Sequence, residues 1–260
     1  MLDLAVYLVL GVALGTVGGL FGIGGGLIVV PVLLLTLPLA GVAPELTAHM
    51  AMGSSLATVL ITALSSSWNH HRRGGVPWRA VWVVAPMAAL GALLAGPLAH
   101  HLDGIWLTRL FALFLLFMAW RQWHAVVRER PLTLPSWLRP AALGVGLISG
   151  LIGIGGGTLL VPLLQRLGLA LTRAVAGSAV CGAVLASMGA LSYLGAGWGA
   201  PGLPALSVGY LYLPAIAGIS CSSWLLAGLG ARLAYRWPSS RLQRVFALLL
   251  LLLAISLLLV

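Results

Sequence analysis

Apolar runs of about twenty residues recur along almost the whole chain, and they limit the fold more than any other feature. A helix of that length crosses the roughly 30 Å hydrocarbon core of a bilayer. Of the 260 residues, 61% are hydrophobic and 7% are charged, which lies far outside the range of soluble globular domains. The sequence therefore predicts an all-α polytopic membrane protein, and the lipid bilayer is its first expected partner.

A five-residue glycine motif occurs twice, at residues 22–26 and again at residues 153–157. Residues 15–31 and 146–162 share ten identities in seventeen aligned positions, which indicates an internal duplication. Adjacent glycines weaken a helix at each position, so we expect a helix to break at each motif. Inside a bilayer, broken helices line binding sites rather than face lipid.

The apolar segments predict two repeats, residues 1–127 and 141–260, joined by a polar, proline-bearing cytoplasmic linker at residues 128–140. Each repeat is expected to hold a glycine-broken hairpin of short helices followed by three transmembrane helices. A further match between residues 107–116 and 242–251 supports this duplication. The expected short segments are 4–20, 25–39, 138–152 and 157–168, and the expected long spans are 46–68, 78–99, 105–127, 173–195, 205–230 and 241–260.

The arginines decide the predicted orientation. The formal net charge of +10 would suggest a nucleic-acid partner in a soluble protein, but in a membrane protein it indicates which ends face the cytoplasm. If each glycine hairpin returns the chain to its own side, the repeats are inverted and Arg109 is the one arginine left outside. If each glycine region crosses once, the repeats are parallel and the arginines divide equally. The positive-inside rule favours inverted repeats, and no nucleic-acid partner is expected.

Two inverted hairpins would bring their tips together near the midplane of the bilayer. A helix that restarts after each glycine motif points its N–H groups and the positive end of its dipole at that place, which suits a small anion. The alternative is that the glycines only allow close helix packing. The glycines predicted to bind the substrate are Gly22, Gly24, Gly25 and Gly26 in the first motif and Gly153, Gly155, Gly156 and Gly157 in the second.

Polar side chains on the following spans complete the predicted site. Ser54, Ser55 and Ser178 lie at equivalent places in the two repeats and could donate to the anion, although serine in a transmembrane helix often bonds its own backbone. His49 lies one turn before Ser54 and could carry a proton or pair with the anion. The alternative reading of His49 is a structural residue with satisfied ring nitrogens.

The sequence predicts neither a metal nor a cofactor. Cys181 and Cys221 fall within apolar spans and are expected to serve in packing, and no Cys/His cluster occurs. Every carboxylate lies at or beyond a span end, whereas proton-coupled carriers usually keep one inside. Because an inside-negative potential drives anions outward, export is the expected direction.

These residues resemble the TauE/SafE family of sulfite exporters, also called TSUP, over essentially the whole chain. The glycine motifs followed by Pro31 and Pro162 carry the most specific match, and Gly53-Ser54-Ser55 resembles the family's Gly-Thr-Ser signature. Residues 70–78 resemble its loop with His, Gly and Trp, and residues 204–214 are similar to YfcA-like members. The chain departs from the pattern at Ser54, in place of Thr, and at Ala179, where the second signature lacks a hydroxyl.

The resemblance implies a multi-pass protein of the bacterial inner membrane that moves sulfite, sulfoacetate or other sulfur-containing organic anions. An anion channel, or a transporter of a different small organic anion, is the first alternative. An enzyme is not expected, because Gly218-Ile-Ser-Cys221 lacks the last glycine of an intramembrane serine protease motif and no His-Glu-x-x-His occurs. A homodimer is compatible with the sequence, which does not fix the oligomeric state.

Overall fold

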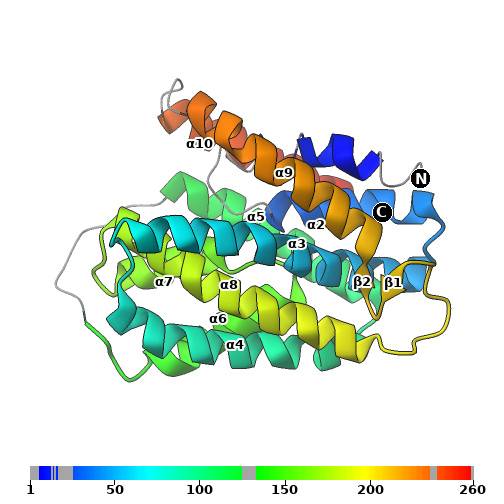
Figure 1. The fold of residues 1–260 in the computed structure, drawn as a ribbon, viewed down its shortest axis with the longest axis horizontal. Helices are drawn as coiled ribbons and strands as arrows, with labels where there is room; N and C mark the ends of the chain where they lie inside the picture. Colours follow the sequence, from blue (N-terminus) through cyan, green and yellow to red (C-terminus); the bar gives the residue numbers. More distant parts are fainter. Residues whose placement is uncertain are drawn as a thin grey trace.

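The computed structural model describes residues 6–12, 14, 16, 26–124, 133–234 and 239–258, and almost all of them are helical (Figure 1). After the helical residues 6–12, the helices are α2 (Gly26–Thr36), the 3₁₀ turn η1 (Pro38–Ala40), α3 (Pro44–Arg72), α4 (Trp78–His100), α5 (Gly104–His124), α6 (Leu138–Leu151), α7 (Gly157–Arg166), α8 (Leu171–Ala196), α9 (Leu213–Ala234) and α10 (Ser239–Leu258). This confirms the expected all-α membrane fold. The predicted linker is described from residue 133, and α6 already begins at Leu138.

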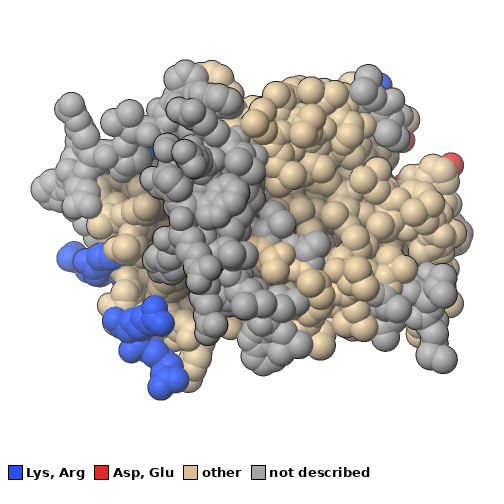
Figure 2. Space-filling view, turned by 90° about the horizontal axis from the view of Figure 1, so that it is seen from above, with Lys and Arg blue, Asp and Glu red and all other residues tan. Residues whose placement is uncertain are grey.

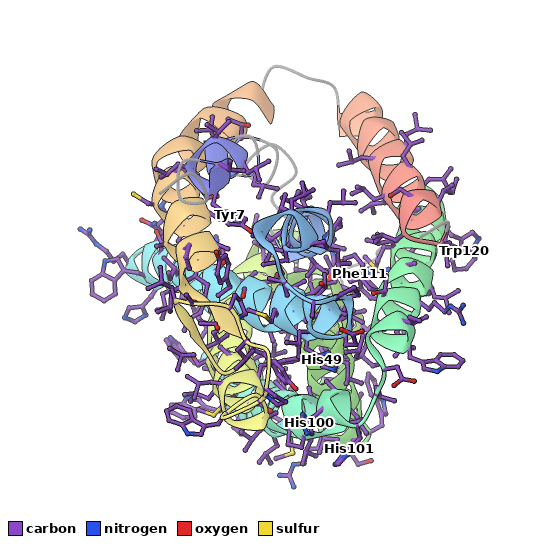
Figure 3. All side chains as sticks on the ribbon, turned by 90° about the vertical axis from the view of Figure 1, so that its right-hand side faces the viewer. Tyr7, His49, His100, His101, Phe111 and Trp120 are labelled. Carbon is purple, nitrogen blue, oxygen red and sulfur yellow. The ribbon has the colours of Figure 1, made fainter. Side chains whose placement is uncertain are left out.

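Four of the described helices, α3, α4, α5 and α8, are long and apolar enough to cross a membrane. Helix α3 lies at the centre of the bundle, where α2, α5, α8 and α9 pack around it (Figure 3). It begins at Pro44, whose missing N–H costs nothing in a first turn, and it ends before Gly74, which has a φ of +66°. The shorter apolar helices fill the remaining positions of the bundle.

Glycine allows the helices beside α3 to approach at backbone distance. A Cβ on Gly146 of α6 would lie 2.0 Å from the Ala88 carbonyl oxygen of α4, and one on Gly91 would lie 2.1 Å from the Leu143 carbonyl oxygen. Lipid chains are as apolar as leucine, so membrane helices associate through such close packing instead of through the hydrophobic effect. Helix α6 is thereby held against α4 along its length.

A proline and a serine join α4 to α8. Pro97 has no N–H, so the Leu93 carbonyl one turn earlier lacks its helical donor. The hydroxyl of Ser192 on α8 donates to that carbonyl and accepts a hydrogen bond from the Gly96 N–H at 2.9 Å. In a bilayer a freed carbonyl needs a partner inside the protein, and a neighbouring helix supplies it here.

The span expected at residues 205–230 is wrong at its beginning. Residues 207–212 form a two-stranded hairpin, β1 (Ser207–Val208) and β2 (Leu211–Tyr212), and α9 starts at Leu213. Left-handed backbone at Leu206 and Gly209, with φ of +65° and +55°, is incompatible with a helix there. The apolar composition of this stretch predicted a helix although the stretch contains turn residues.

The hairpin of α6 and α7 enters and leaves the bundle at the same end. The N–H of Thr133, before α6, donates to the Leu167 carbonyl, after α7, at 3.0 Å. At 1.5 Å per residue the 14 residues of α6 and the 10 of α7 reach about 21 and 15 Å, short of a full crossing. The sequence left open whether this hairpin crosses twice or turns back inside, and these helix lengths favour the second arrangement.

Charged residues separate between the two ends of the bundle (Figure 2). We call the end where α3 finishes and α4 starts the arginine-rich end, because seven arginines lie at helix ends there: Arg72, Arg73, Arg79, Arg121, Arg139, Arg166 and Arg173. Glu45 and Arg109 lie near the starts of α3 and α5, at the opposite end. Helices α3 and α8 run antiparallel, because Gly53 meets Tyr193 and Leu56 meets Gly189. That direction suits an inverted repeat, while the repeat relation itself stays a prediction.

Candidate functional site

The second glycine motif forms a tight turn between α6 and α7, which we call the glycine turn (residues 152–156). Gly153 and Gly156 have φ of +70° and +72°, a left-handed conformation that side chains with a Cβ rarely adopt. The Ile154 N–H donates to the Ser149 carbonyl at 2.8 Å, and the Gly156 N–H donates to the Ile154 carbonyl at 2.8 Å. Gly156 is the N-cap residue of α7, so the turn delivers the chain directly into a new helix.

The glycine turn lies halfway along the two long helices that enclose it. A Cβ on Gly155 would meet the Val59 side chain near the middle of α3, and a Cβ on Gly182 in the middle of α8 would lie 2.5 Å from the Gly155 carbonyl oxygen. The turn therefore lies near the level expected for the bilayer midplane, since α3 and α8 are long enough to span it.

Gly26, the first described residue of α2, lies against the glycine turn. A Cβ on Gly26 would lie 3.4 Å from both the Gly155 amide nitrogen and the Ile154 Cα. From Gly26, α2 leads to the 3₁₀ turn before α3, while α7 leads to the arginine-rich end, so the two short helices run apart from this place. The structure thus shows the second motif as a turn that leads into α7 and places Gly26 of the first motif against it, while the paired anion site stays a prediction. Gly22, Gly24 and Gly25 lie outside the described residues.

The first turn of α7 presents free backbone donors. Within the described part of the chain, the N–H groups of Gly155, Gly157 and Thr158 have no backbone acceptor, whereas those of Leu159 and Leu160 donate to the Gly156 carbonyl. Unpaired donors at a helix N-terminus carry the positive end of the helix dipole. This is the arrangement that binds oxyanions in many proteins.

Three buried hydroxyls near the glycine turn have no hydrogen-bond partner among the described residues. They are Ser149 on α6 just before the turn, Thr158 on α7 just after it, and Ser55 on α3 across from it. Ser55 lies three residues after Met52, which a Cβ on Gly153 would touch, and four residues before Val59, so it shares their side of α3. A fourth such hydroxyl, Ser220, lies on α9.

Other hydroxyls in the same bundle follow the usual solution for a membrane helix. Thr58, Ser187 and Ser222 each donate to a carbonyl four residues earlier in their own helix, at 2.7 to 2.9 Å. The buried hydroxyls of Ser55, Ser149 and Thr158 do not. An unsatisfied buried hydroxyl costs about 1–3 kcal/mol, so a cluster of them around free N–H groups is the signature of a site for a polar ligand.

Two serines that the sequence assigned to the site have different surroundings. Ser54 is fully buried on the opposite side of α3 from Val59, where its hydroxyl accepts a hydrogen bond from the Tyr212 N–H at 2.9 Å. Ser178 is buried on α8, one turn before Gly182 and toward the arginine-rich end. Ser55 and Ser178 therefore face the region of the glycine turn, while Ser54 fastens β2 to α3.

His49 lies among backbone carbonyls near the start of α3 (Figure 3). Its Nδ1 is 3.1 Å from the Glu45 carbonyl oxygen, and its Nε2 is 2.9 and 3.1 Å from those of Ala99 and Leu102. The ring thus ties α3 to the connection between α4 and α5. Ten residues separate His49 from Val59, which is about 15 Å along the helix. This geometry favours the structural reading of His49 over contact with an anion at the turn.

The β1–β2 hairpin covers the same end of the bundle. The Tyr210 ring lies 5.1 Å from the His49 ring, and the Tyr210 hydroxyl lies 2.9 Å from the Nδ1 of His100 (Figure 3). Burial raises the pKa of the Tyr210 hydroxyl, so it stays protonated at neutral pH and can donate this hydrogen bond. The hairpin thereby fastens the loops of that end to α3.

Sequence reasoning missed a contact between α5 and the first turn of α7. Pro162 has no N–H, which leaves the Thr158 carbonyl four residues earlier without its helical donor. Nη1 of Arg121, a half-buried residue of α5, donates to that carbonyl at 3.1 Å. Pro162 could have predicted a carbonyl in need of a donor, but the donor comes from a residue 37 positions away in the chain.

The described residues contain no group of three His, Cys, Asp or Glu side chains that could hold a metal ion. Cys181 is buried and Cys221 is exposed on the bundle, and both are free thiols. The donors at the glycine turn are instead backbone N–H groups and hydroxyls, which suit an anion better than a cation.

A multi-pass bundle in which two short helices meet at a buried glycine turn has the architecture of a membrane transporter. The comparison with known families agrees with this class. The chain belongs to the sulfite exporter TauE/SafE family, whose model matches residues 7–257.

Several relatives carry the same general description. A probable membrane transporter protein of Haemophilus influenzae is 36% identical over 252 residues, which is 96% of each chain. One from Methanocaldococcus jannaschii is 29% identical over 75% of this chain and 73% of its own. A third, YunE of Bacillus subtilis, is 23% identical over 98% of this chain and 97% of its own. No solved structure matches this chain.

Proposed function

We propose that this protein exports small sulfur-containing oxyanions, such as sulfite or an organosulfonate, across the bacterial inner membrane. The observation that carries the proposal is the glycine turn. There, among the described residues, N–H groups of α7 lack a backbone acceptor and three buried hydroxyls lack a partner, those of Ser55, Ser149 and Thr158. The family name supplies the sulfur chemistry. The turn supplies donors for oxygen atoms that carry negative charge.

The direction of transport follows from charge. If the arginine-rich end faces the cytoplasm, an anion is drawn to that end and the membrane potential drives it outward, by about 2.3 kcal/mol per charge per 100 mV. Glu45, the carboxylate of the described transmembrane helices, lies in the first turn of α3 at the opposite end. Outward movement down the potential needs no carboxylate inside the bundle to couple it to protons.

Removing single hydroxyls tests whether the glycine turn binds the anion. Thr158→Val keeps the shape of the side chain, and Ser55→Ala removes one oxygen atom. Each change should leave the fold as stable as before or slightly more stable, because each removes an unsatisfied buried group. Each should raise the KM for the anion about tenfold if the hydroxyl donates to it, since a hydrogen bond to a charged group contributes about 1.5–3 kcal/mol.

The measurement is efflux of sulfite, sulfoacetate and sulfate from proteoliposomes under an imposed potential, with melting temperature in detergent as the check on folding. Ser187→Ala is the matched control, because the Ser187 hydroxyl bonds to the Ala183 carbonyl of its own helix. Unchanged KM in both Thr158→Val and Ser55→Ala, beside a functional wild type, would move the site away from the glycine turn. If the wild type transports none of the three anions, the proposed substrate class is wrong.

A further inference from the structure

Arg121 is the arginine that the structure joins to the first turn of α7. Its Nη1 donates to the Thr158 carbonyl, and within the described residues the Thr158 hydroxyl has no partner and its N–H has no backbone acceptor. We propose that Arg121 binds the transported anion directly, on the arginine-rich side of the glycine turn. This inference rests on the proposed function, since it gives the same anion a further partner that neither the family name nor the relatives assign.

The position of Arg121 follows from Pro162. Because Pro162 cannot donate to the Thr158 carbonyl, that oxygen attracts a donor from a neighbouring element, and the guanidinium of Arg121 takes the place. A positive group is thereby fixed one helical turn from the donors at the start of α7. The bond to Thr158 engages Nη1, and a guanidinium has five N–H groups in one plane, so further donors are available to a ligand.

The charge of Arg121 is not neutralised by a carboxylate in the described part of the chain. Glu45 and Asp103 lie at the other end of the bundle, Asp103 directly before the start of α5 and Arg121 in its last turn. Arg166, at the end of α7, is a second positive charge that repels the charge of Arg121. A half-buried, uncompensated charge in a membrane bundle is costly, so its presence points to an anion that occupies the region part of the time.

The geometry of the guanidinium indicates the class of ligand that it binds. Two parallel N–H groups match two oxygen atoms of a carboxylate, sulfonate or sulfite group. A sulfur oxyanion has a third oxygen, which the Thr158 hydroxyl and the free N–H groups of α7 can bind. A chloride ion has no pair of oxygen atoms for the two N–H groups, so the guanidinium would bind it less specifically.

The test compares Arg121→Gln with Arg109→Gln. Arg109 belongs to the same helix, but it is exposed at the opposite end, 5.6 Å from the Trp106 ring centre. Glutamine removes the charge at either position while its amide can still donate to a carbonyl, so the Thr158 bond can survive. Sulfite efflux from proteoliposomes should show a KM raised at least tenfold in Arg121→Gln and unchanged in Arg109→Gln. Arg121→Lys should recover part of the affinity, because it restores charge without the fork.

A second variant separates binding from a structural role. Pro162→Ala returns a helical N–H to the Thr158 carbonyl, so the helix no longer needs Arg121 as a donor. If Arg121 only supported the helix, Pro162→Ala would restore the KM of Arg121→Gln in the double variant. If Arg121 binds the anion, the KM defect remains. Restoration of the KM, or an unchanged KM in Arg121→Gln, would overturn the inference.

A binding measurement keeps this inference apart from the transport proposal. Sulfite and sulfate should raise the melting temperature of the purified wild type and of Arg109→Gln, with chloride at equal ionic strength as the reference. Arg121→Gln should need at least tenfold more anion for the same rise. Wild-type stabilisation without flux would contradict the transport proposal and keep the Arg121 site. Equal responses of the two variants, or no response in the wild type, would contradict the Arg121 site whatever the flux.

Discussion

At the scale of single residues, the glycine turn depends on Gly155 having no side chain, because its backbone lies against the Val59 side chain of α3. A Cβ on Gly155 would lie 1.9 Å from Cγ1 of Val59, and the other atoms it would approach also belong to Val59. Gly155→Ala should therefore destabilise the protein by about 1–3 kcal/mol through overpacking. Val59→Ala removes the colliding methyl groups and should rescue much of this loss, so the double variant should be more stable than the sum of the single changes predicts.

The check is a double-mutant cycle of unfolding in detergent, with sulfite efflux measured on the same four proteins. A coupling energy of about 1 kcal/mol or more is expected for residues in such direct contact. Simple additivity of the two changes would show that Gly155 does not lie against Val59. Because the rescue is judged by stability, this result does not depend on whether the protein carries sulfite.

The sequence located the turn at the second glycine motif, but it did not show which side chains face that turn. The glycine motif is recognised by its composition and its repetition, and the break in the helix there follows from the low helix propensity of glycine. Which of two adjacent serines faces the turn depends on the rotation of α3, and the structure directs Ser55 to it while Ser54 bonds the Tyr212 N–H. Arg121 was counted as a topology signal, because its partner at Thr158 is distant in sequence.

At the scale of elements, the position of the glycine turn is set by the packing of α6 on α4. A Cβ on Gly146 would lie 2.0 Å from the Ala88 carbonyl oxygen, which is backbone and cannot move aside as a side chain can. Gly146→Ala should push the helices apart, lower stability by about 1–3 kcal/mol or more, and reduce efflux by displacing the turn. Gly144 lies two residues away with no atom within 4 Å of such a Cβ, so Gly144→Ala should stabilise by about 0.5–1 kcal/mol.

Melting temperature and efflux of Gly146→Ala and Gly144→Ala test whether α6 packs on α4 through Gly146, since the two changes add the same methyl group to the same helix. Equal effects would mean that α6 does not pack on α4 through Gly146. Gly146 serves helix packing, whereas Gly153 and Gly156 serve the left-handed turn.

Element boundaries show where sequence patterns are sufficient and where they are not. The broken hairpin was expected at residues 138–152 and 157–168 and is observed as α6 (Leu138–Leu151) and α7 (Gly157–Arg166), because glycine at its tip and polar residues at its ends mark it clearly. The prediction for residues 205–212 was wrong, because hydropathy does not distinguish an apolar hairpin from the start of an apolar helix. Turn residues such as Gly209, which has a left-handed backbone, were the local signal for the hairpin.

At the scale of the whole molecule, the structure fixes which segments share an end, and the membrane decides which end faces the cytoplasm. The 3₁₀ turn with Leu39 precedes α3, and a Cβ on Gly202, after α8, would lie 3.7 Å from Leu46 in the first turn of α3, so Leu39 and Trp198 lie at one end. Arg73 follows α3, and Thr133 bonds to Leu167 beside the start of α8, so these two lie at the other. The positive-inside rule assigns Arg73 and Thr133 to the cytoplasm.

Cysteines introduced singly at these four exposed positions, in a background lacking Cys181 and Cys221, test the orientation of the whole bundle. A membrane-impermeant maleimide should label Leu39→Cys and Trp198→Cys in intact spheroplasts, and it should label Arg73→Cys and Thr133→Cys after the membrane is opened. Labelling of Arg73→Cys from outside would reverse the orientation, and with it the expected direction of anion movement, because the arginines would then attract anions to the outer face. Opposite behaviour of Arg73→Cys and Thr133→Cys would contradict the fold itself, since the α6–α7 hairpin would no longer return to the end that it left.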